Sequence, residues 1–317
     1  MTPAAFVLLL AAGSFAATQL KPSPSVPSDP EAFRISVDVS LVVLQATVRD
    51  REGHTVPNLS SQDFEVFEDG RLQPIRLFRH EDTPVTVGLV IDHSGSMSEK
   101  LGDVTAGARA FVKSSNSHDQ MFVVDFNETV SLGLPQGIGF SDNADQLGNA
   151  IWARPAEGRT ALYDAILSGL NRLGEGASDK KVLIVISDGG DNASKSRLDR
   201  VLKMAEQSSA VIYTIGLFEP DDPDANPKVL RRLAQETGGQ AFFPAKLSET
   251  VEICQRIARD IRDQYTIGYS SATDKRDGSY HKVRLTARAK ADGKLSVRTR
   301  AGYSTEAPLP PGRAPVR

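Results

Sequence analysis

The stretch "VTVGLVIDHSGSMSEK", residues 85–100, decides the fold. An apolar run ends in Leu89, Val90 and Ile91, and Asp92 and the Ser94-Gly95-Ser96 triplet follow at once. Such a run is typical of a strand that is buried on both faces of a parallel sheet. We therefore expect the oxygen-bearing residues in a loop at the end of this strand, where they hold a ligand.

The pattern continues beyond this stretch as an alternation of apolar runs and segments of helical period. The other predicted strands are 120–127, 180–189, 210–217 and 240–245, and the predicted helices are 99–115, 160–173, 197–209, 226–239 and 248–264. Alternation of this kind predicts a mainly parallel, doubly wound α/β sheet with helices on both faces.

Segments of strand pattern flank this α/β region, which we place at residues 83–262. Residues 33–82 show apolar residues at alternate positions, and the same pattern returns over 263–304. Neither half is large enough for a core of its own, so we expect the two to pair into one split, sandwich-like β domain. The Pro-rich segments 18–32 and 305–317 are predicted to be a linker and a disordered tail.

The start of the chain predicts export. An apolar run from Ala4 to Ala12 precedes the small-residue pattern Ser14-Phe15-Ala16, which is typical of a signal peptide over residues 1–17. The run is too short for a stable membrane span. We expect a secreted protein, or a periplasmic or cell-envelope protein. The alternative is an unprocessed apolar N-terminus, because the first residues contain no Lys or Arg.

Overall charge and cysteine content exclude other classes. A formal net charge of -3 gives no basic field for nucleic acid. Cys254 is the only cysteine of the 317 residues, so neither an intrachain disulfide nor a thiolate zinc cluster can form.

Three segments bring oxygen ligands to the carboxyl ends of predicted strands, where doubly wound sheets bind ligands. These ligands are Asp92, Ser94 and Ser96 after the first strand, Thr160 at a loop-to-helix junction, and Asp188 after the most apolar run. Two carboxylates with three hydroxyls suit Mg²⁺, with Mn²⁺ or Ca²⁺ as alternatives, whereas zinc prefers His or Cys.

This constellation resembles the metal-ion-dependent adhesion site of the von Willebrand factor A domain, over residues 85 to about 262. The motif D-x-S-x-S is intact from Asp92 to Ser96. The resemblance implies hydroxyl ligands from Ser94, Ser96 and Thr160, with Asp92 and Asp188 coordinating directly or through water. Residues 59–70 and 265–285 further resemble a bacterial secreted VWFA-related group of the acidobacterial type.

The resemblance favours a non-enzymatic binding or adhesion module. Its Mg²⁺ would capture an Asp or Glu carboxylate of a protein partner. The alternatives are a structural or assembly scaffold of the cell envelope and, third, a metal-dependent hydrolase. Hydrolysis has little support, because Ser94 and Ser96 lie in no G-x-S-x-G elbow, although His93 is their neighbour.

Several other features have both a functional and a plain structural interpretation. Asp164 supports the site from behind or caps a loop, and Asp191 and Asn192 shape the loop after Asp188. The acidic segment 219–227 is a solvated loop rather than a calcium site, and Cys254 is a core residue. The last helix, 248–264, either couples the β domain to the metal site or is part of a rigid spacer.

Overall fold

The computed structural model describes residues 41–218, 225–271, 278–289 and 293–305. At its centre is a six-stranded sheet in the order β10-β9-β8-β5-β6-β7, parallel except for the edge strand β7. Its strands are β5 (Val85–Asp92), β6 (Gln120–Phe126), β7 (Val130–Leu132), β8 (Lys180–Ser187), β9 (Val211–Gly216) and β10 (Ala241–Phe242). The predicted signal peptide and linker, nearly all of the predicted tail and most of the acidic segment 219–227 lie outside the described residues.

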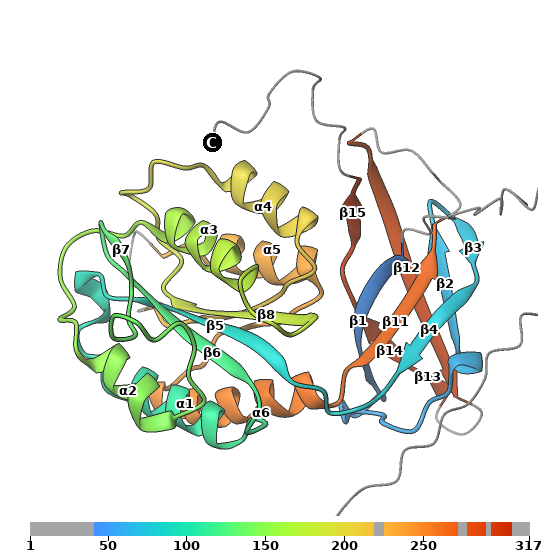
Figure 1. The fold of residues 1–317 in the computed structure, drawn as a ribbon, viewed down its shortest axis with the longest axis horizontal. Coiled ribbons are helices and arrows are strands. Elements are labelled where there is room, and N and C mark those ends of the chain that lie inside the picture. Colours follow the sequence, from blue (N-terminus) through green and yellow to red (C-terminus); the bar gives the residue numbers. More distant parts are fainter. Residues whose placement is uncertain (1–40, 219–224, 272–277, 290–292, 306–317) are drawn as a thin grey trace, which may run out of the picture. The chain divides into compact units, whose positions relative to one another are not determined.

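Helices cover both faces of this sheet, which confirms the predicted doubly wound α/β fold. Figure 1 shows α3, α4 and α5 on one face and α1, α2 and α6 on the other. Their bounds are α1 (Leu101–Lys113), α2 (Ala144–Trp152), α3 (Leu162–Leu173), α4 (Leu198–Gln207), α5 (Pro227–Thr237) and α6 (Thr250–Arg262).

Strand β5 forms the centre of the core, and every one of its eight residues is buried. Gly88 interrupts the apolar run for a steric reason. A Cβ at this position would lie 2.5 Å from the Phe122 ring and 2.7 Å from Leu183 Cδ1. The neighbours of β5 are β6 on one side and β8 on the other, so the strand order reverses at β5. A crevice at the carboxyl ends of strands is expected at such a switch point.

Two antiparallel sheets are built from strands on both sides of the α/β segment. One has the order β14-β1-β11-β4, and the other has the order β13-β12-β2-β3 with β15 also paired to β12. Their bounds are β1 (Leu41–Arg49), β2 (Phe64–Glu68), β3 (Arg71–Gln73), β4 (Ile75–Arg79), β11 (Tyr265–Ser270), β12 (Tyr280–Ala289), β13 (Gly293–Lys294), β14 (Ser296–Arg298) and β15 (Gly302–Ser304).

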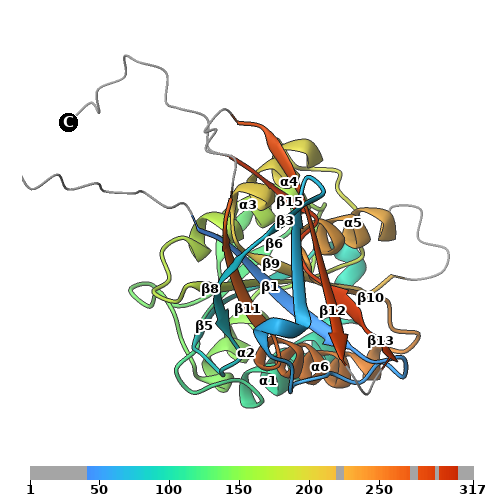
Figure 2. The ribbon, with the colours of Figure 1, turned by 90° about the vertical axis from the view of Figure 1, so that its right-hand side faces the viewer.

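Strands from the two ends of the described chain therefore lie side by side, as Figure 2 shows by the blue and orange-red ribbons. Strand β1 pairs with β11, and β2 pairs with β12. Their inward side chains share one apolar cluster that includes Leu44, Val66 and Ile267. The domain boundaries drawn from the sequence stay a prediction, but this pairing places the α/β segment between two halves of the antiparallel part.

The structure differs from the sequence-based prediction in three elements. Helix α2 and the edge strand β7 were not predicted. The end of the segment predicted to have strand pattern, near residues 294–304, contains two separate short strands, β14 and β15, which pair with β1 and β12 respectively. Asn143 marks the start of α2, because its side chain accepts hydrogen bonds from the N–H groups of Asp145 and Gln146.

A buried carboxylate joins α6 to the antiparallel strands. Asp260 accepts two hydrogen bonds from the Arg49 guanidinium, at 2.6 and 2.8 Å, and a third from Arg298 at 3.3 Å. Only 3% of the Asp260 side chain is exposed. We call Arg49, Asp260 and Arg298 the junction triad.

Further charged groups meet where the chain enters and leaves the α/β segment. Arg262 forms ion pairs with Asp82 and Asp119, and the Lys180 ammonium donates to the main-chain oxygen of Ile261. Burial, aided by the charge of Arg262, lowers the pKa of Lys180 to about 7, against the attraction of nearby carboxylates. The amino-terminal edge of the sheet thus contains basic groups that lie beside acids.

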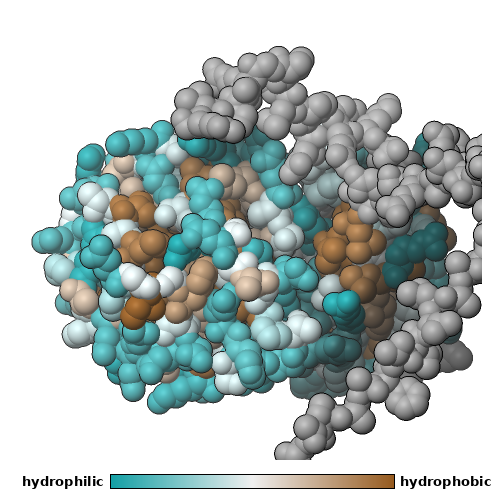
Figure 3. Space-filling model, viewed as in Figure 1, coloured by the Kyte–Doolittle hydropathy of each residue, from teal (hydrophilic) through white to brown (hydrophobic). Residues whose placement is uncertain are grey.

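The surface is mainly hydrophilic, with a few exposed apolar residues. Figure 3 shows hydrophobic residues gathered near β7 and near β1 and β11, with hydrophilic residues between them. Leu132 in β7 is 52% exposed and Leu41 in β1 is 41% exposed. No helix in the described part of the chain combines the length and the apolar character that a membrane crossing requires.

Candidate metal centre

Main-chain hydrogen bonds bring the three predicted ligand segments together. Gly95 N–H donates to the carbonyl oxygen of Gly158 at 3.2 Å, and this bond ties the loop after β5 to the segment before Thr160. The N–H groups of Asn192 and Ala193 both donate to the carbonyl oxygen of Thr160 at 3.0 Å. The loops after β5 and β8 are therefore both attached to the segment that starts α3.

Four of the five predicted ligand residues form one polar group through their side chains and the N–H of Ser94. Ser94 Oγ lies 3.2 Å from Ser96 Oγ, and Ser96 Oγ donates to Asp188 Oδ2 at 2.5 Å. Asp92 Oδ1 accepts the N–H of Ser94 at 2.8 Å, and its Oδ2 accepts the hydroxyl of Ser187 at 2.6 Å. Ser187 was missed in the sequence, although it is the last residue of the apolar run and directly precedes Asp188.

Thr160 is buried at the start of α3, and its main chain is fixed on both sides. Its N–H donates to Asn192 Oδ1 at 2.9 Å, and the next N–H, of Ala161, donates to the carbonyl oxygen of Asn127 at 2.7 Å. Thr160 thus stands beside the loop that contains Asp188. The five-residue ligand set remains a prediction.

The electrostatics of this group call for a cation. Asp92 is fully buried and Asp188 is 2% exposed. Burial raises the pKa of Asp92 to about 6, against the hydrogen bonds from Ser187 and Ser94, and the charge of Asp188 raises it further. No Lys, Arg or His forms an ion pair with either carboxylate within the described ranges. Two buried carboxylates with hydroxyl neighbours match the hard oxygen ligands of Mg²⁺.

Two further aspartates hold the loop after Asp188 and do not contact the predicted ligands. Asp164 accepts the N–H groups of Lys195 at 2.8 Å and Ser196 at 3.0 Å. Its partial burial acts to raise the pKa, but these hydrogen bonds outweigh burial and hold the pKa below its ordinary value. Asp191 accepts the Ser194 hydroxyl at 2.6 Å and the Tyr163 N–H at 3.2 Å.

His93 lies inside the D-x-S-x-S motif, but its ring turns away from the serines. Its ring nitrogens lie 2.8 Å from the carbonyl oxygen of Ile151 and 3.2 Å from that of Ile91. Burial lowers the pKa of His93, against the two carbonyls. The charge of Arg154 also lowers the pKa of His93. Asp125 lies 3.7 Å from the ring, and burial raises the pKa of this carboxyl to about 7. His93 is therefore a packed core residue with no access to a serine hydroxyl.

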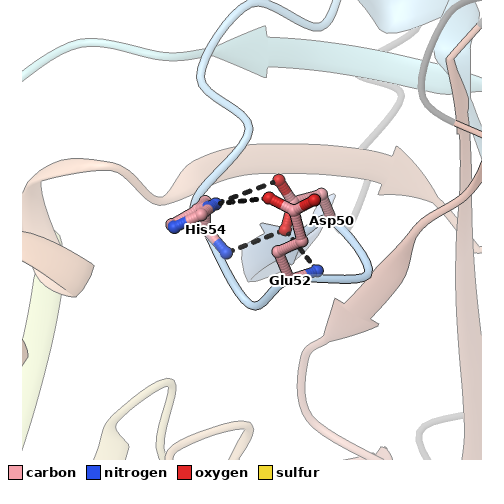
Figure 4. A group of neighbouring side chains, drawn as sticks. All are labelled: Asp50, Glu52 and His54. Atoms are coloured by element: carbon pink, nitrogen blue, oxygen red, sulfur yellow. Dashed lines mark hydrogen bonds and ion pairs between the residues drawn. The ribbon is translucent and has the colours of Figure 1, made fainter.

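Two other groups in the described residues bring two acids together, and each also contains a histidine. In the exposed turn of Figure 4, the carboxylates of Asp50 and Glu52 lie 3.5 Å from the ring of His54, and Asp50 also accepts two main-chain N–H groups. In the second group, Glu68 accepts hydroxyls of Tyr269 and Tyr303, and Asp69 pairs with His281 at 2.8 Å. Protein partners already satisfy these acids.

Comparisons with known proteins agree with the fold. The von Willebrand factor type A domain profile matches residues 86–256. An uncharacterized protein of Synechocystis sp. is 25% identical over 179 residues, which are 55% of this chain and 41% of that protein. The chain thus spans less than half the length of this curated relative.

Solved structures match this chain at low identity, and the first of the two below shares its fold. A von Willebrand factor type A structure from Catenulispora acidiphila has a TM-score of 0.51 and 15% identity, and the match covers 86% of this chain and 74% of that chain. The vWF domain of the type V pili tip protein Mfa5 from Porphyromonas gingivalis has a TM-score of 0.47 and 15% identity, over 61% of this chain and 99% of that chain.

The family profile covers more than half of the chain, and the doubly wound sheet with its helices has the expected architecture. This protein therefore belongs to the von Willebrand factor type A domain family.

Proposed function

We propose that this chain is a non-enzymatic binding module that captures a carboxylate of a protein partner through a divalent cation, Mg²⁺ in the first place. The cation would be held by Asp92, Ser94, Ser96, Thr160 and Asp188. The setting we propose is secreted or cell-envelope associated, as the N-terminal segment predicts.

The observation that carries the proposal is the excess negative charge of the site. Asp92 and Asp188 are buried, close enough for their charges to interact, and bound by hydroxyl and N–H groups alone within the described ranges. Buried charges in proteins are normally paired or coordinate a metal. A bound divalent cation supplies the missing positive charge.

The chemistry of the donors also supports an external carboxylate as the ligand. Three of the five predicted donors are neutral hydroxyls, so the protein contributes only two negative charges to a doubly charged cation. A cation that is not over-neutralised by its protein ligands retains affinity for an anionic oxygen. Ser96 is exposed whereas Ser94 and Thr160 are buried, so the site opens to solvent on the Ser96 side.

At the candidate metal centre, neither serine has a histidine base within reach. Ser96 Oγ donates to a carboxylate that we assign to the cation, and the ring of His93 contacts main-chain carbonyls instead of a serine. A nucleophilic serine needs a base within hydrogen-bonding reach. The arrangement therefore supports binding over hydrolysis.

Calorimetric titration of the purified protein with Mg²⁺ and Mn²⁺ tests the proposal. We expect the wild type to bind one equivalent and Asp188→Asn to lose at least about tenfold in affinity, because removing a charged ligand oxygen weakens coordination. Asp199→Asn is the matched control, because it removes the same charge at an exposed position of α4. No binding by the wild type, or equal loss in both variants, would contradict the proposal.

A scaffold role is the second candidate, favoured by the attachment of α6 to the antiparallel strands through the junction triad. In that case the cation only stabilises the fold. Melting curves with and without Mg²⁺, set beside capture of a carboxylate ligand, separate the two roles. A large rise in melting temperature without carboxylate binding would favour the scaffold.

A further inference from the structure

We propose that Arg159 is a second anion contact beside the metal centre, so that the partner segment carries two neighbouring carboxylates, one for the cation and one for this guanidinium. The inference rests on the proposed function and specifies its ligand: an acidic peptide rather than a single acid side chain. Arg159 directly precedes Thr160, one of the predicted metal ligands.

The main chain on both sides of Arg159 is held in place. Its own N–H donates to Glu128 Oε2 at 2.9 Å, and the N–H of Thr160 donates to Asn192 Oδ1 at 2.9 Å. Gly158, just before it, has a φ of +80° and comes so close to Glu128 that a Cβ would lie 1.9 Å from Oε2. The positive φ favours glycine at this position, whereas the exposed Glu128 side chain could move aside. The two main-chain hydrogen bonds hold the backbone of Arg159 in place.

The guanidinium lies over the loop that follows Asp188. Arg159 Nη1 donates to the carbonyl oxygen of Asn192 at 3.4 Å, a long hydrogen bond, and the residue is exposed. Within the described ranges, no acidic side chain forms an ion pair with it. The Glu128 carboxylate accepts the N–H of Arg159 and is near enough for the two charges to attract, but it forms no ion pair with the guanidinium. Most of the five N–H donors of this guanidinium are thus available to a ligand.

Charge and geometry favour a carboxylate at this position. Asp92, Asp188 and a divalent cation sum to zero charge, so the first ligand carboxylate would leave the site with one negative charge. The Arg159 cation opposes that charge and favours anions on its own side of the site. An arginine fork also binds a carboxylate through two parallel hydrogen bonds, which a lysine does not do.

The test compares a dicarboxylate with a monocarboxylate on the Mn²⁺-loaded protein. Succinate, glutarate and acetate are titrated, and binding is followed by the change in water proton relaxation caused by the bound Mn²⁺. Protein-free titrations correct for complexes in solution. For the wild type we expect the better dicarboxylate to bind about fivefold more tightly than acetate. Having two equivalent carboxylates accounts for a statistical factor of about two, and one favourable ion pair accounts for the rest.

Variants assign the preference to one side chain. Arg159→Gln should bring the dicarboxylate preference down to about twofold and leave acetate and Mn²⁺ affinity within twofold of the wild type, and Arg159→Lys should retain part of it. Lys195→Gln is the control of equal charge, because Lys195 is also exposed and stands on the loop after Asp188. It should keep the full preference.

The outcomes separate this inference from the proposed function. Absence of Mn²⁺ binding, or of any acetate effect, contradicts the carboxylate-binding function itself. Normal metal and acetate binding with the same dicarboxylate preference in wild type and Arg159→Gln overturns only the role of Arg159. An equal loss in Lys195→Gln also overturns it, because the effect would then come from overall charge.

Discussion

Among the described residues, buried charges are unpaired at one edge of the parallel sheet and paired at the other. At the carboxyl edge, Asp92 and Asp188 are buried together, and no basic group forms an ion pair with either within the described ranges. On the other side of the α/β segment, the buried Asp260 binds two arginines, and Arg262 binds both Asp82 and Asp119. The first arrangement needs a cation from outside, whereas the second is complete.

This difference separates a binding site from a structural joint by physical criteria alone. Removing one partner of a buried, hydrogen-bonded ion pair strongly destabilises the folded protein, because the charge of the other partner is left uncompensated. Two buried carboxylates without a counter-charge instead repel each other, so their presence opposes folding unless a ligand offsets it. The following predictions test whether each edge behaves accordingly.

The largest effect is expected at the junction triad. Asp260→Ala leaves two arginines, only 16% and 24% exposed, without their common carboxylate. We expect a loss of about 3–5 kcal/mol in the free energy of unfolding, as for other broken buried ion pairs. Urea denaturation followed by circular dichroism gives the value.

The control for this prediction is Asp199→Ala, whose side chain is 80% exposed and should change stability by less than about 0.5 kcal/mol. A loss below about 1 kcal/mol in Asp260→Ala would show that the triad is a surface-like contact. The inference that the junction triad is a strong, fully paired buried contact would then be wrong.

At the carboxyl edge, we expect the free energy of unfolding to depend on bound Mg²⁺. Mg²⁺ at 100 times its dissociation constant should raise the free energy of unfolding by about 2.7 kcal/mol, since it binds only the folded site. In Asp188→Asn, with an affinity at least about tenfold lower, the increase at the same Mg²⁺ concentration should fall to about 1.4 kcal/mol or less. Metal-free stability should stay near the wild type, because one of two repelling carboxylates becomes neutral. Equal stabilisation of both proteins by Mg²⁺ would place the cation elsewhere.

A smaller effect is expected from Lys180, the buried amine at the complete edge. Its pKa is lowered from 10.5 to about 7, so the unfolded chain binds more protons than the folded one between these values. Stability should therefore rise with pH above about 7, by up to about 1.4 kcal/mol per unit. Lys180→Met should flatten this rise, as denaturation at pH 7, 8 and 9 can show. Parallel curves for the two proteins would contradict the assignment.

The sequence predicts the sheet and most of its helices because these depend on local pattern. Strand β5 and strand β8 are apolar runs that need burial on both faces, and α6 has its apolar residues at helical spacing. Helix α2 has a weaker signal, an Asn143 cap followed by Gln146, and it was missed. Strands β14 and β15 are three residues each, so only their partners β1 and β12 define them.

The position of the candidate metal site was likewise predictable, to the extent that its residues end recognisable strands. Asp92 and Asp188 follow apolar runs, and the structure places both beside the serines of the D-x-S-x-S motif. The junction triad could not be foreseen, because Arg49 and Asp260 are 211 positions apart and nothing local pairs them. The contribution of Ser187 depends on the register between β8 and β5, which the sequence does not specify.

The smallest expected effect concerns communication between the two edges. If α6 were coupled to the metal centre, loosening its attachment should change the affinity for Mg²⁺, since coupling between two sites is reciprocal. Asp260→Asn removes the charge of the triad with little change in shape, and in the described part of the chain the triad forms no hydrogen bond with the ligand segments. One path between them runs through α1, which packs against α6 and begins five residues after Ser96. Because Gly107 of α1 meets Cys254 and Thr250 of α6 in close packing, we expect α6 to be held as a rigid part of the core.

The Mg²⁺ dissociation constant of folded Asp260→Asn, measured by calorimetry, should stay within about twofold of the wild type. This is less than the roughly fivefold change at which allosteric coupling usually begins. A larger shift would show that the junction triad influences the metal centre, and it would favour coupling through α6 over a rigid spacer.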